Sequence, residues 1–144
     1  MSADETGREN RPNRTLGPGH DTFWEWCARG ELRLPRCTGC GKLLWPVASA
    51  CDHCGGGAFT WERQSGRARL VGWNVFAQSY FKGVLETPYT TILVELEDGP
   101  LFVANPVGFG EGDMAPGLAL ELRFVPARDQ AGDFDLPVFA LAEM

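Results

Sequence analysis

The sequence predicts a mainly β chain with a short N-terminal helix, a metal-binding module and a five-stranded C-terminal barrel. Two observations lead to this class. Four of the five cysteines form two Cys-x-x-Cys-Gly motifs, at residues 37–41 and 51–55. From Arg67 onward, apolar residues alternate with polar ones, which is typical of half-buried strands. The length of 144 residues allows one medium domain or two small ones, and the 44% hydrophobic share is that of a globular protein.

The two cysteine motifs predict a structural metal site. Cysteines at i and i+3 in a tight turn direct both sulfurs toward one point, and the glycine that follows permits a positive φ. Two such motifs, with ten residues between Cys40 and Cys51, supply four thiolates, which suits a closed tetrahedral zinc site. The predicted ligands are Cys37, Cys40, Cys51 and Cys54. We expect His53 to be a solvent-exposed residue and not a fifth ligand.

Other uses of these cysteines are less consistent with the sequence. Disulfides suit a secreted protein, but residues 1–5 have neither the basic start nor the apolar run of a signal peptide. A redox pair would leave the second motif unexplained. A rubredoxin-type iron site uses the same ligands, so iron stays open as an alternative to zinc. With no signal and metal-type cysteine spacing, we expect a cytoplasmic protein.

Charge argues against nucleic acid as a partner, and hydropathy argues against a membrane span. The net charge is −6; residues 1–65 carry eight basic and eight acidic residues, whereas residues 66–144 carry five basic and eleven acidic ones. An acidic barrel argues against nucleic acid as the main partner, because phosphate binding needs a basic face. No apolar run approaches the roughly 20 residues that span a bilayer.

The N-terminal part divides into a tail and a helix. Residues 1–20 are polar and rich in Arg, Asn, Gly and Pro, so we expect a disordered tail. Residues 21–31 are predicted to form a short helix, in which Thr22 and Glu25 fit a capping box and Gly30 a stop.

Three aromatic residues, Phe23, Trp24 and Trp26, are many for so short a helix. Packing within the chain is the more common role for any one of them. A helix of about two turns can bury only one face against its own chain. We therefore expect at least one of the three to bind a partner protein. The fifth cysteine, Cys27, is expected to be a small buried apolar residue.

Residues 32–65 form the predicted metal module, which is too small to fold without its metal. Residues 66–144 form the predicted barrel, with Ser65-Gly66 as the boundary. In the first strand we expect Val71, Trp73, Val75 and Ala77 on one face. A hairpin turn is predicted at 97–100 and a brief helical turn within 108–114. The five predicted strands are 68–80, 89–97, 100–105, 118–125 and 136–141. This pattern favours an OB-type Greek-key barrel, while an SH3-like barrel or half a sandwich would give a similar pattern.

Catalytic signatures are not evident in the sequence. The chain has two histidines, one in the tail and one between metal ligands. No G-x-S-x-G, phosphate-binding glycine loop or H-E-x-x-H is found. Four thiolates would saturate a metal and leave it no catalytic role. We therefore expect a binding or scaffolding subunit that catalyses nothing alone; a single-stranded nucleic-acid module and an iron-containing electron carrier are the alternatives.

The order of short sequence motifs along the chain is specific enough to indicate a family. A helix that opens with Phe23-Trp24 is followed by Gly30-Glu31-Leu32 and then by the two cysteine motifs. Further on come Ser65-Gly66-Arg67, Pro88-Tyr89, Val94-Glu95-Leu96 with Asp98-Gly99, and Leu136-Pro137-Val138-Phe139. Over about residues 21–143 this order resembles the acyl-CoA-associated family once called "domain of unknown function 35".

The resemblance implies a rubredoxin-like zinc ribbon and an OB fold. It also implies a partner from the thiolase superfamily, such as a thiolase or an aldolase that shortens steroid side chains. The partner would hold the catalytic residues, so this chain would serve lipid or steroid degradation as an accessory subunit. It would help to hold acyl-CoA, and the candidate contacts in the first half of the barrel are Arg67, Arg69, Trp73, Phe81 and Lys82. Cations can pair with phosphates and aromatic rings can cover adenine, although most such residues are simply solvated or part of a core.

Overall fold

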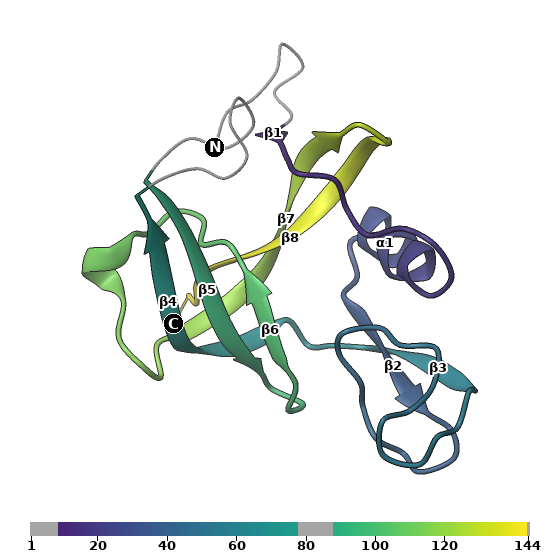
Figure 1. Cartoon of the computed structure of the whole chain (residues 1–144). Helices are drawn as coiled ribbons and strands as arrows, with labels where there is room; N and C mark the ends of the chain where they lie inside the picture. Colours follow the sequence, from purple (N-terminus) through teal and green to yellow (C-terminus); the bar gives the residue numbers. More distant parts are fainter. Residues whose placement is uncertain (1–8, 78–87, 144) are drawn as a thin grey trace.

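The computed structural model describes residues 9–77 and 88–143. Figure 1 shows a β-barrel, a small two-stranded module beside it, and a helix that lies close to both. Residues 9–19 run along one side of the barrel before they enter the helix, and we call this segment the strap. In the described residues no helix has the length and apolarity needed to cross a membrane.

The barrel has the predicted OB-type connectivity. Its strands, in chain order, are β4 (Arg67–Phe76), β5 (Tyr89–Leu96), β6 (Leu101–Ala104), β7 (Ala119–Asp129) and β8 (Gly132–Leu141). They lie in the antiparallel order β6-β5-β4-β7-β8. A parallel bridge between Pro106 and Phe139 joins the two ends, with Phe139 accepting a 2.9 Å hydrogen bond from the Val107 N–H. The predicted turns are present, as a tight turn at Gly99 (φ +118°) and a 3₁₀ turn η1 (Glu111–Asp113).

A bulge in β4 changes which residues face the core. Leu70 pairs with Val94 and Gly72 pairs with Leu93, so Val71 is an extra residue between them. Leu70 is buried, Val71 is 44% exposed, and Trp73 packs against the core. The expectation that Val71 shares a face with Trp73 is therefore wrong, because the inserted residue shifts the two-residue period.

The β7–β8 hairpin is longer than the sequence predicts. The apolar alternation ends near Pro126, but the ladder continues through Pro126–Asp135 to Asp129–Gly132. Proline and charged residues interrupt the alternation of apolar and polar residues, but the two strands stay paired. The added length matters because it provides the surface on which the strap lies.

The strap is ordered along this hairpin. Strand β1 (Glu9–Asn10) pairs in parallel with Ala127 and Arg128 of β7. Arg14 then donates from Nε to Asp129 at 2.8 Å, and its guanidinium lies 4.1 Å from the Phe134 ring centroid. The prediction of a disordered tail is thus wrong for residues 9–19. These residues bury few apolar side chains, but their polar groups form hydrogen bonds and an ion pair with β7. Residues 1–8 lie outside the described part.

Helix α1 (His20–Ala28) begins earlier than predicted and without the expected capping box. Gly19 is its N-cap, with φ +82°, and Asp21 accepts a 3.0 Å hydrogen bond from the Gly17 N–H. The turn at residues 17–19 therefore starts the helix before Thr22 could cap it. The predicted stop is confirmed, since Gly30 has φ +76° and donates to the Cys27 carbonyl at 2.9 Å.

The small module shares one hydrophobic core with the helix and the barrel. Its strands β2 (Arg33–Cys37) and β3 (Phe59–Arg63) pair antiparallel. Leu32 and Leu34 belong to the same buried cluster as Phe23 of the helix and Phe102 of the barrel. A second, smaller cluster around Leu44 contains two of the cysteines. The module is therefore anchored to the barrel through side chains at one end and carries the cysteines at the other.

The Arg14–Asp129 pair predicts how the strap responds to mutation and pH. Asp129 has a fully buried side chain; burial raises its pKa, but hydrogen bonds from Arg14 outweigh this, so the pKa lies below its usual value. Arg14→Ala should lower the free energy of unfolding by about 2 kcal/mol, because a buried carboxylate loses its charged guanidinium partner and keeps only the backbone N–H groups of residue 14 and Ala131. In the wild type this contribution is present above the unfolded pKa of about 3.9 and disappears as pH falls through the folded value.

Denaturant unfolding of both proteins at pH 7 and pH 3 measures the effect. Arg67→Ala is the control, because Arg67 pairs with Glu97 at 3.5 Å with both side chains exposed, and its loss should cost less than about 0.5 kcal/mol. Equal losses in the two variants would show that the strap contributes nothing specific.

Candidate metal centre and neighbouring surfaces

Each cysteine motif closes as a tight turn. Gly41 has φ +80° and donates to the Cys37 carbonyl at 2.8 Å. Gly55 has φ +79° and donates to the Cys51 carbonyl at 2.9 Å. Glycine adopts this left-handed conformation without strain, so the predicted role of the residue after each second cysteine is confirmed.

The turns bring all four predicted sulfurs together. The Sγ atoms of Cys37, Cys40, Cys51 and Cys54 lie within 4.8 Å of one another. The Sγ–Sγ distance is 3.5 Å for Cys37–Cys54 and 3.6 Å for Cys40–Cys51. A tetrahedral ion with metal–sulfur bonds of about 2.3 Å would place its sulfurs about 3.8 Å apart. The donor set therefore fits a tetrathiolate ion, and four protein ligands leave no position for a substrate.

Backbone N–H groups favour the thiolate form of two of the four cysteines. The backbone N–H of Cys40 lowers the pKa of Cys37 to about 7. The backbone N–H of Cys54 likewise lowers the pKa of Cys51, which also accepts a 3.4 Å hydrogen bond from the His53 N–H. For the other two, the N–H groups of Lys42 and Gly56 act in the same direction, but burial and the neighbouring cysteine side chains outweigh them and raise the pKa, to about 12 for Cys40 and above its usual value for Cys54. A Cβ at Gly56 would lie 3.3 Å from the Cys54 sulfur, so the loop wraps closely around the cluster. Thiolates surrounded by N–H donors are suited to metal binding.

The remaining cysteine and the nearby histidine lie outside the cluster. Cys27 is 1% exposed, and burial raises the pKa of its thiol to about 12, as expected for an inert core residue. His53 is exposed, and the four sulfurs are grouped without it.

The aromatic residues of α1 occupy three different environments. Phe23 is 3% exposed and lies in the core, so partner binding by at least one of the three residues stays a prediction that rests on Trp24 and Trp26. Trp24 is half-buried and contacts Phe134 edge-on, with ring centroids 5.2 Å apart. Trp26 is also half-buried, and the guanidinium groups of Arg29 and Arg33 lie 4.9 Å and 4.0 Å from its ring centroid.

The predicted CoA contacts do not form one site in the described residues, because Arg67 and Arg69 line one depression on β4 and Trp73 is not part of it. Arg67 and Arg69 are exposed on β4, where their cross-strand neighbours are Glu121 and Glu95. Trp73 packs against the core. Acidic neighbours weaken the attraction of these cations for phosphate. Phe81 and Lys82 lie outside the described residues, so CoA binding by this set stays a prediction.

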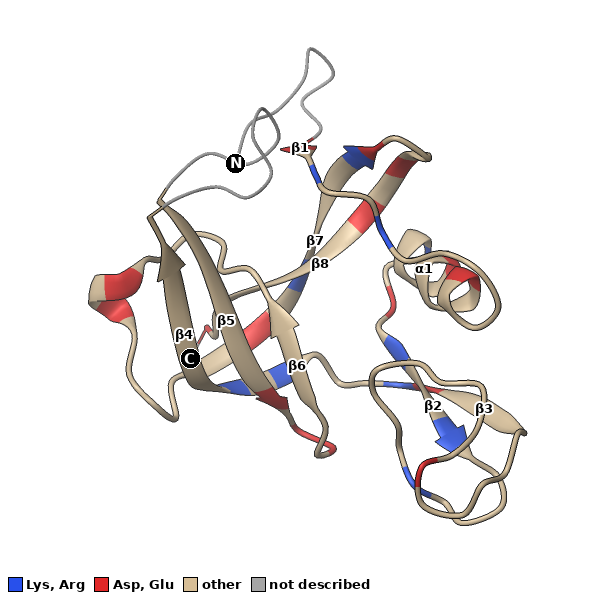
Figure 2. Ribbon diagram, viewed as in Figure 1, with Lys and Arg blue, Asp and Glu red and all other residues tan. Residues whose placement is uncertain are grey.

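Charge on the barrel does not favour nucleic acid. Figure 2 shows acidic residues at the ends of the barrel strands and in the turns between them. They include exposed Glu95, Glu97, Asp98, Glu111 and Asp113. The outer side of β5 and β6, which binds oligonucleotides in many OB folds, carries half-buried Leu93 and exposed Leu101 and Val103. Aliphatic side chains lack the stacking surface and charge that single strands require.

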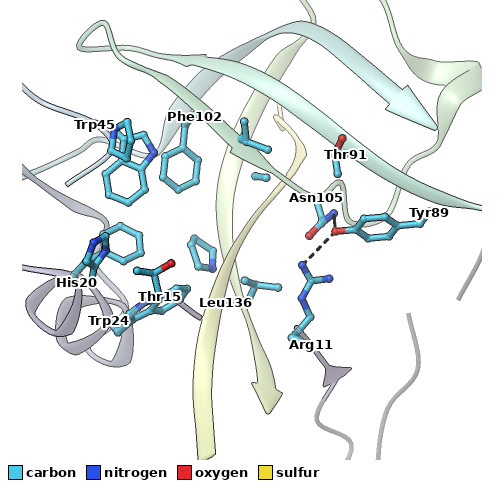
Figure 3. Close-up of a pocket in the computed structure, with 15 residues that line it drawn as sticks. Arg11, Thr15, His20, Trp24, Trp45, Tyr89, Thr91, Phe102, Asn105 and Leu136 are labelled. Carbon is cyan, nitrogen blue, oxygen red and sulfur yellow. Dashed lines mark hydrogen bonds between the residues drawn. The ribbon is translucent and has the colours of Figure 1, made fainter. Parts of the chain in front are cut away.

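Sequence reasoning missed a cavity of about 330 Å³ between the strap, the helix, the module and the barrel. Figure 3 shows aromatic rings at one end and Arg11, Tyr89 and Asn105 at the other. No local pattern marks these residues, because they come from distant parts of the chain.

The fold and the cysteine cluster define a protein with a zinc-ribbon domain joined to an OB-fold domain. Residues 24–60 match the sequence family described as the ChsH2 rubredoxin-like zinc ribbon domain, and residues 61–125 match the ChsH2 C-terminal OB-fold domain. The chain belongs to the ChsH2/DUF35 family. A search of curated protein sequences returned no match.

Two of the similar solved structures show how far the likeness extends. The Ltp2-ChsH2(DUF35) aldolase contains a chain with 27% identity and a TM-score of 0.78, and the match covers 91% of this chain and 100% of that one. A protein of unknown function from the DUF35 family of Sulfolobus solfataricus has 16% identity and a TM-score of 0.57, covering 74% of this chain and 78% of that one. The second likeness shows the fold alone.

The cluster predicts which cysteines are needed for metal. Cys54→Ser should lose the bound metal and much of the module's structure, because the remaining thiolates no longer saturate the ion. Metal content per chain by plasma mass spectrometry, together with near-ultraviolet circular dichroism, measures both effects. Cys27→Ser is the matched control, since it replaces a buried cysteine outside the cluster; it should destabilise the core but keep the metal. Full metal content in Cys54→Ser would contradict the four-cysteine site.

Proposed function

We propose that this chain is the non-catalytic subunit of a thiolase-like aldolase or thiolase that acts on acyl-CoA in lipid or steroid degradation. The observation that carries the proposal is its similarity to a chain of the Ltp2-ChsH2(DUF35) aldolase, which extends over the whole of that chain. Because the match covers all of that chain, both of its domains and the junction between them correspond to parts of this chain. The likeness is therefore not limited to one common module. The partner would supply the reacting groups, and this chain would stabilise the assembly and help to hold acyl-CoA.

We further propose that the ion in the cysteine cluster is zinc with a structural role. Support comes from the match to a zinc ribbon domain and from a donor set with no position for a further ligand. Zinc protein is colourless, whereas a ferric tetrathiolate is red, so an absorption spectrum of the purified chain decides between the two ions.

The surface around Trp26 is our candidate for partner docking. Trp and Arg are the residues most enriched at energetically dominant interface positions. Here two guanidinium groups lie against the Trp26 ring, and Arg33 is held in place by a 3.0 Å hydrogen bond to Glu31 and a 3.1 Å bond to the Trp61 carbonyl. A held, partly exposed aromatic–cationic surface loses little conformational entropy on binding. It suits a partner that presents carboxylates beside apolar groups.

Trp24 is the second candidate on the helix. It is half-buried beside Phe134 and Arg14, so it would contribute mainly by keeping the strap and the helix in place for docking.

Co-expression with a thiolase-like partner tests the proposed function. The isolated chain should cleave no acyl-CoA, the two proteins should co-elute on size exclusion, and the complex should be active. Acyl-CoA cleavage at an enzymatic rate by the isolated chain would contradict the assignment as a non-catalytic subunit.

Trp26→Ala tests the docking surface. We expect the affinity for the partner to fall about thirtyfold, because loss of a dominant interface residue costs about 2 kcal/mol. Calorimetry measures the affinity, and the melting temperature of the free chain verifies that the variant is folded. Val71→Ala is the control, since Val71 is an exposed apolar residue on the barrel. If both variants bind the partner as the wild type does, the docking surface lies elsewhere.

A further inference from the structure

The cavity beneath the strap has one apolar end and one polar end. Phe23, Trp24, Trp45 and Phe102 line the apolar end, and neighbouring rings pack with centroids 4.6–5.1 Å apart. Figure 3 shows three of these rings, Trp24, Trp45 and Phe102. These rings come from the helix, the zinc ribbon and the barrel, so the cavity is a feature of the assembled chain. Ligand sites occur preferentially at such junctions between domains.

The polar end is built around Asn105, whose orientation is fixed by its hydrogen bonds. Its Nδ2 donates to the Thr90 carbonyl at 2.9 Å and to the Tyr89 hydroxyl at 3.0 Å. Because a carbonyl can only accept, the amide nitrogen must face Thr90, and Oδ1 must point the other way. Asn105 is 5% exposed, and within the described residues no donor reaches Oδ1. Oδ1 is therefore an acceptor with a fixed direction that is open to a ligand in the cavity.

Tyr89 offers the opposite kind of group. Its hydroxyl oxygen accepts from Asn105 and, at 3.3 Å, from Nη2 of Arg11. Two accepted bonds occupy its lone pairs and leave its own proton to donate. The polar end therefore presents an acceptor, Asn105 Oδ1, close to a donor, the Tyr89 O–H (Figure 3).

A ligand that satisfies both groups must carry a donor and an acceptor side by side. A secondary amide does so, with its N–H toward Oδ1 and its carbonyl toward the Tyr89 hydroxyl. A carboxylate or an ester would place an oxygen against Oδ1. The volume of 330 Å³ corresponds to about eleven water molecules at about 30 Å³ each, so the cavity has room for a small organic molecule.

We propose that this cavity binds a small molecule in which a secondary amide adjoins an apolar, preferably aromatic, group. This inference is separate from the proposed function, because it requires neither the partner nor catalysis.

Matched ligands test the proposal on the full-length, metal-loaded chain. N-(2-phenylethyl)acetamide has an amide beside an aromatic ring; 2-phenylethyl acetate is its ester isostere, and 4-phenylbutyrate is the carboxylate of the same size. By calorimetry we expect the amide to bind about tenfold more tightly than the ester, because the ester leaves Oδ1 without a donor. Equal binding of amide and ester, tighter binding of the carboxylate, or no binding of the amide would overturn the proposal.

A variant pair locates the site. Thr15 is exposed and lines the mouth of the cavity, so Thr15→Phe should fill it and abolish amide binding. Leu16, the next residue, is 45% exposed and lines a different depression, so Leu16→Phe should bind as the wild type does. Unchanged metal content and melting temperature show that both variants are folded. Binding that survives Thr15→Phe would place the ligand elsewhere and refute the site.

A peptide ligand distinguishes a small-molecule site from a docking pocket for another polypeptide. N-acetyl-phenylalanine methylamide carries the same chemistry on a polypeptide backbone. If it bound more tightly than N-(2-phenylethyl)acetamide, the cavity would be a docking pocket for another polypeptide, and the small-molecule assignment would be wrong.

Discussion

The structure depends on a row of aromatic rings that joins its three parts. Phe23 of the helix packs on Trp45 of the zinc ribbon at 4.6 Å between centroids, Trp45 packs on Phe102 of the barrel at 5.1 Å, and Phe102 contacts Phe139 at 6.3 Å. Each aromatic pair contributes about 0.5–1.5 kcal/mol beyond its buried area. Trp45 lies in the segment between the two cysteine motifs. Metal binding, which fixes both ends of that segment, therefore also positions the ring that joins the ribbon to the barrel.

This coupling explains how a small metal module can matter for surfaces far from the metal. The ribbon alone has a minor buried cluster around Leu44, whereas Leu32 and Leu34 belong to the main core. Loss of the metal would free Trp45, open the aromatic end of the cavity and loosen Phe23 beneath the helix. A closed metal site thus acts through packing, since it has no position at which a substrate could bind.

Features set by neighbouring residues could be predicted from the sequence, and features set by distant residues could not. The cysteine cluster follows from i, i+3 spacing and a glycine, and the Gly30 helix stop is equally local. The bulge at Val71, the strap along β7 and the burial of Phe23 depend on pairing between segments that are far apart. The predicted helix start is wrong because Gly19, and not Thr22, is the N-cap residue of the helix. Polar content suggested disorder in residues 9–19, but Asp129, more than a hundred residues away, supplies their partner.

The same distinction explains why the cavity escaped sequence reasoning. Arg11, Trp45, Tyr89 and Asn105 each have an unremarkable local setting, and only closure of the strap over the barrel brings them to one place. Asn105 is informative because it is buried at the closing bridge of the barrel, where its main-chain carbonyl accepts a 3.2 Å hydrogen bond from the Phe139 N–H. Barrel closure therefore holds the backbone of Asn105, and Thr90 and Tyr89 hold its side chain. Because both the backbone and the amide nitrogen are held, Oδ1 keeps one direction, and a molecule in the cavity that brings its own donor fits it without rearrangement.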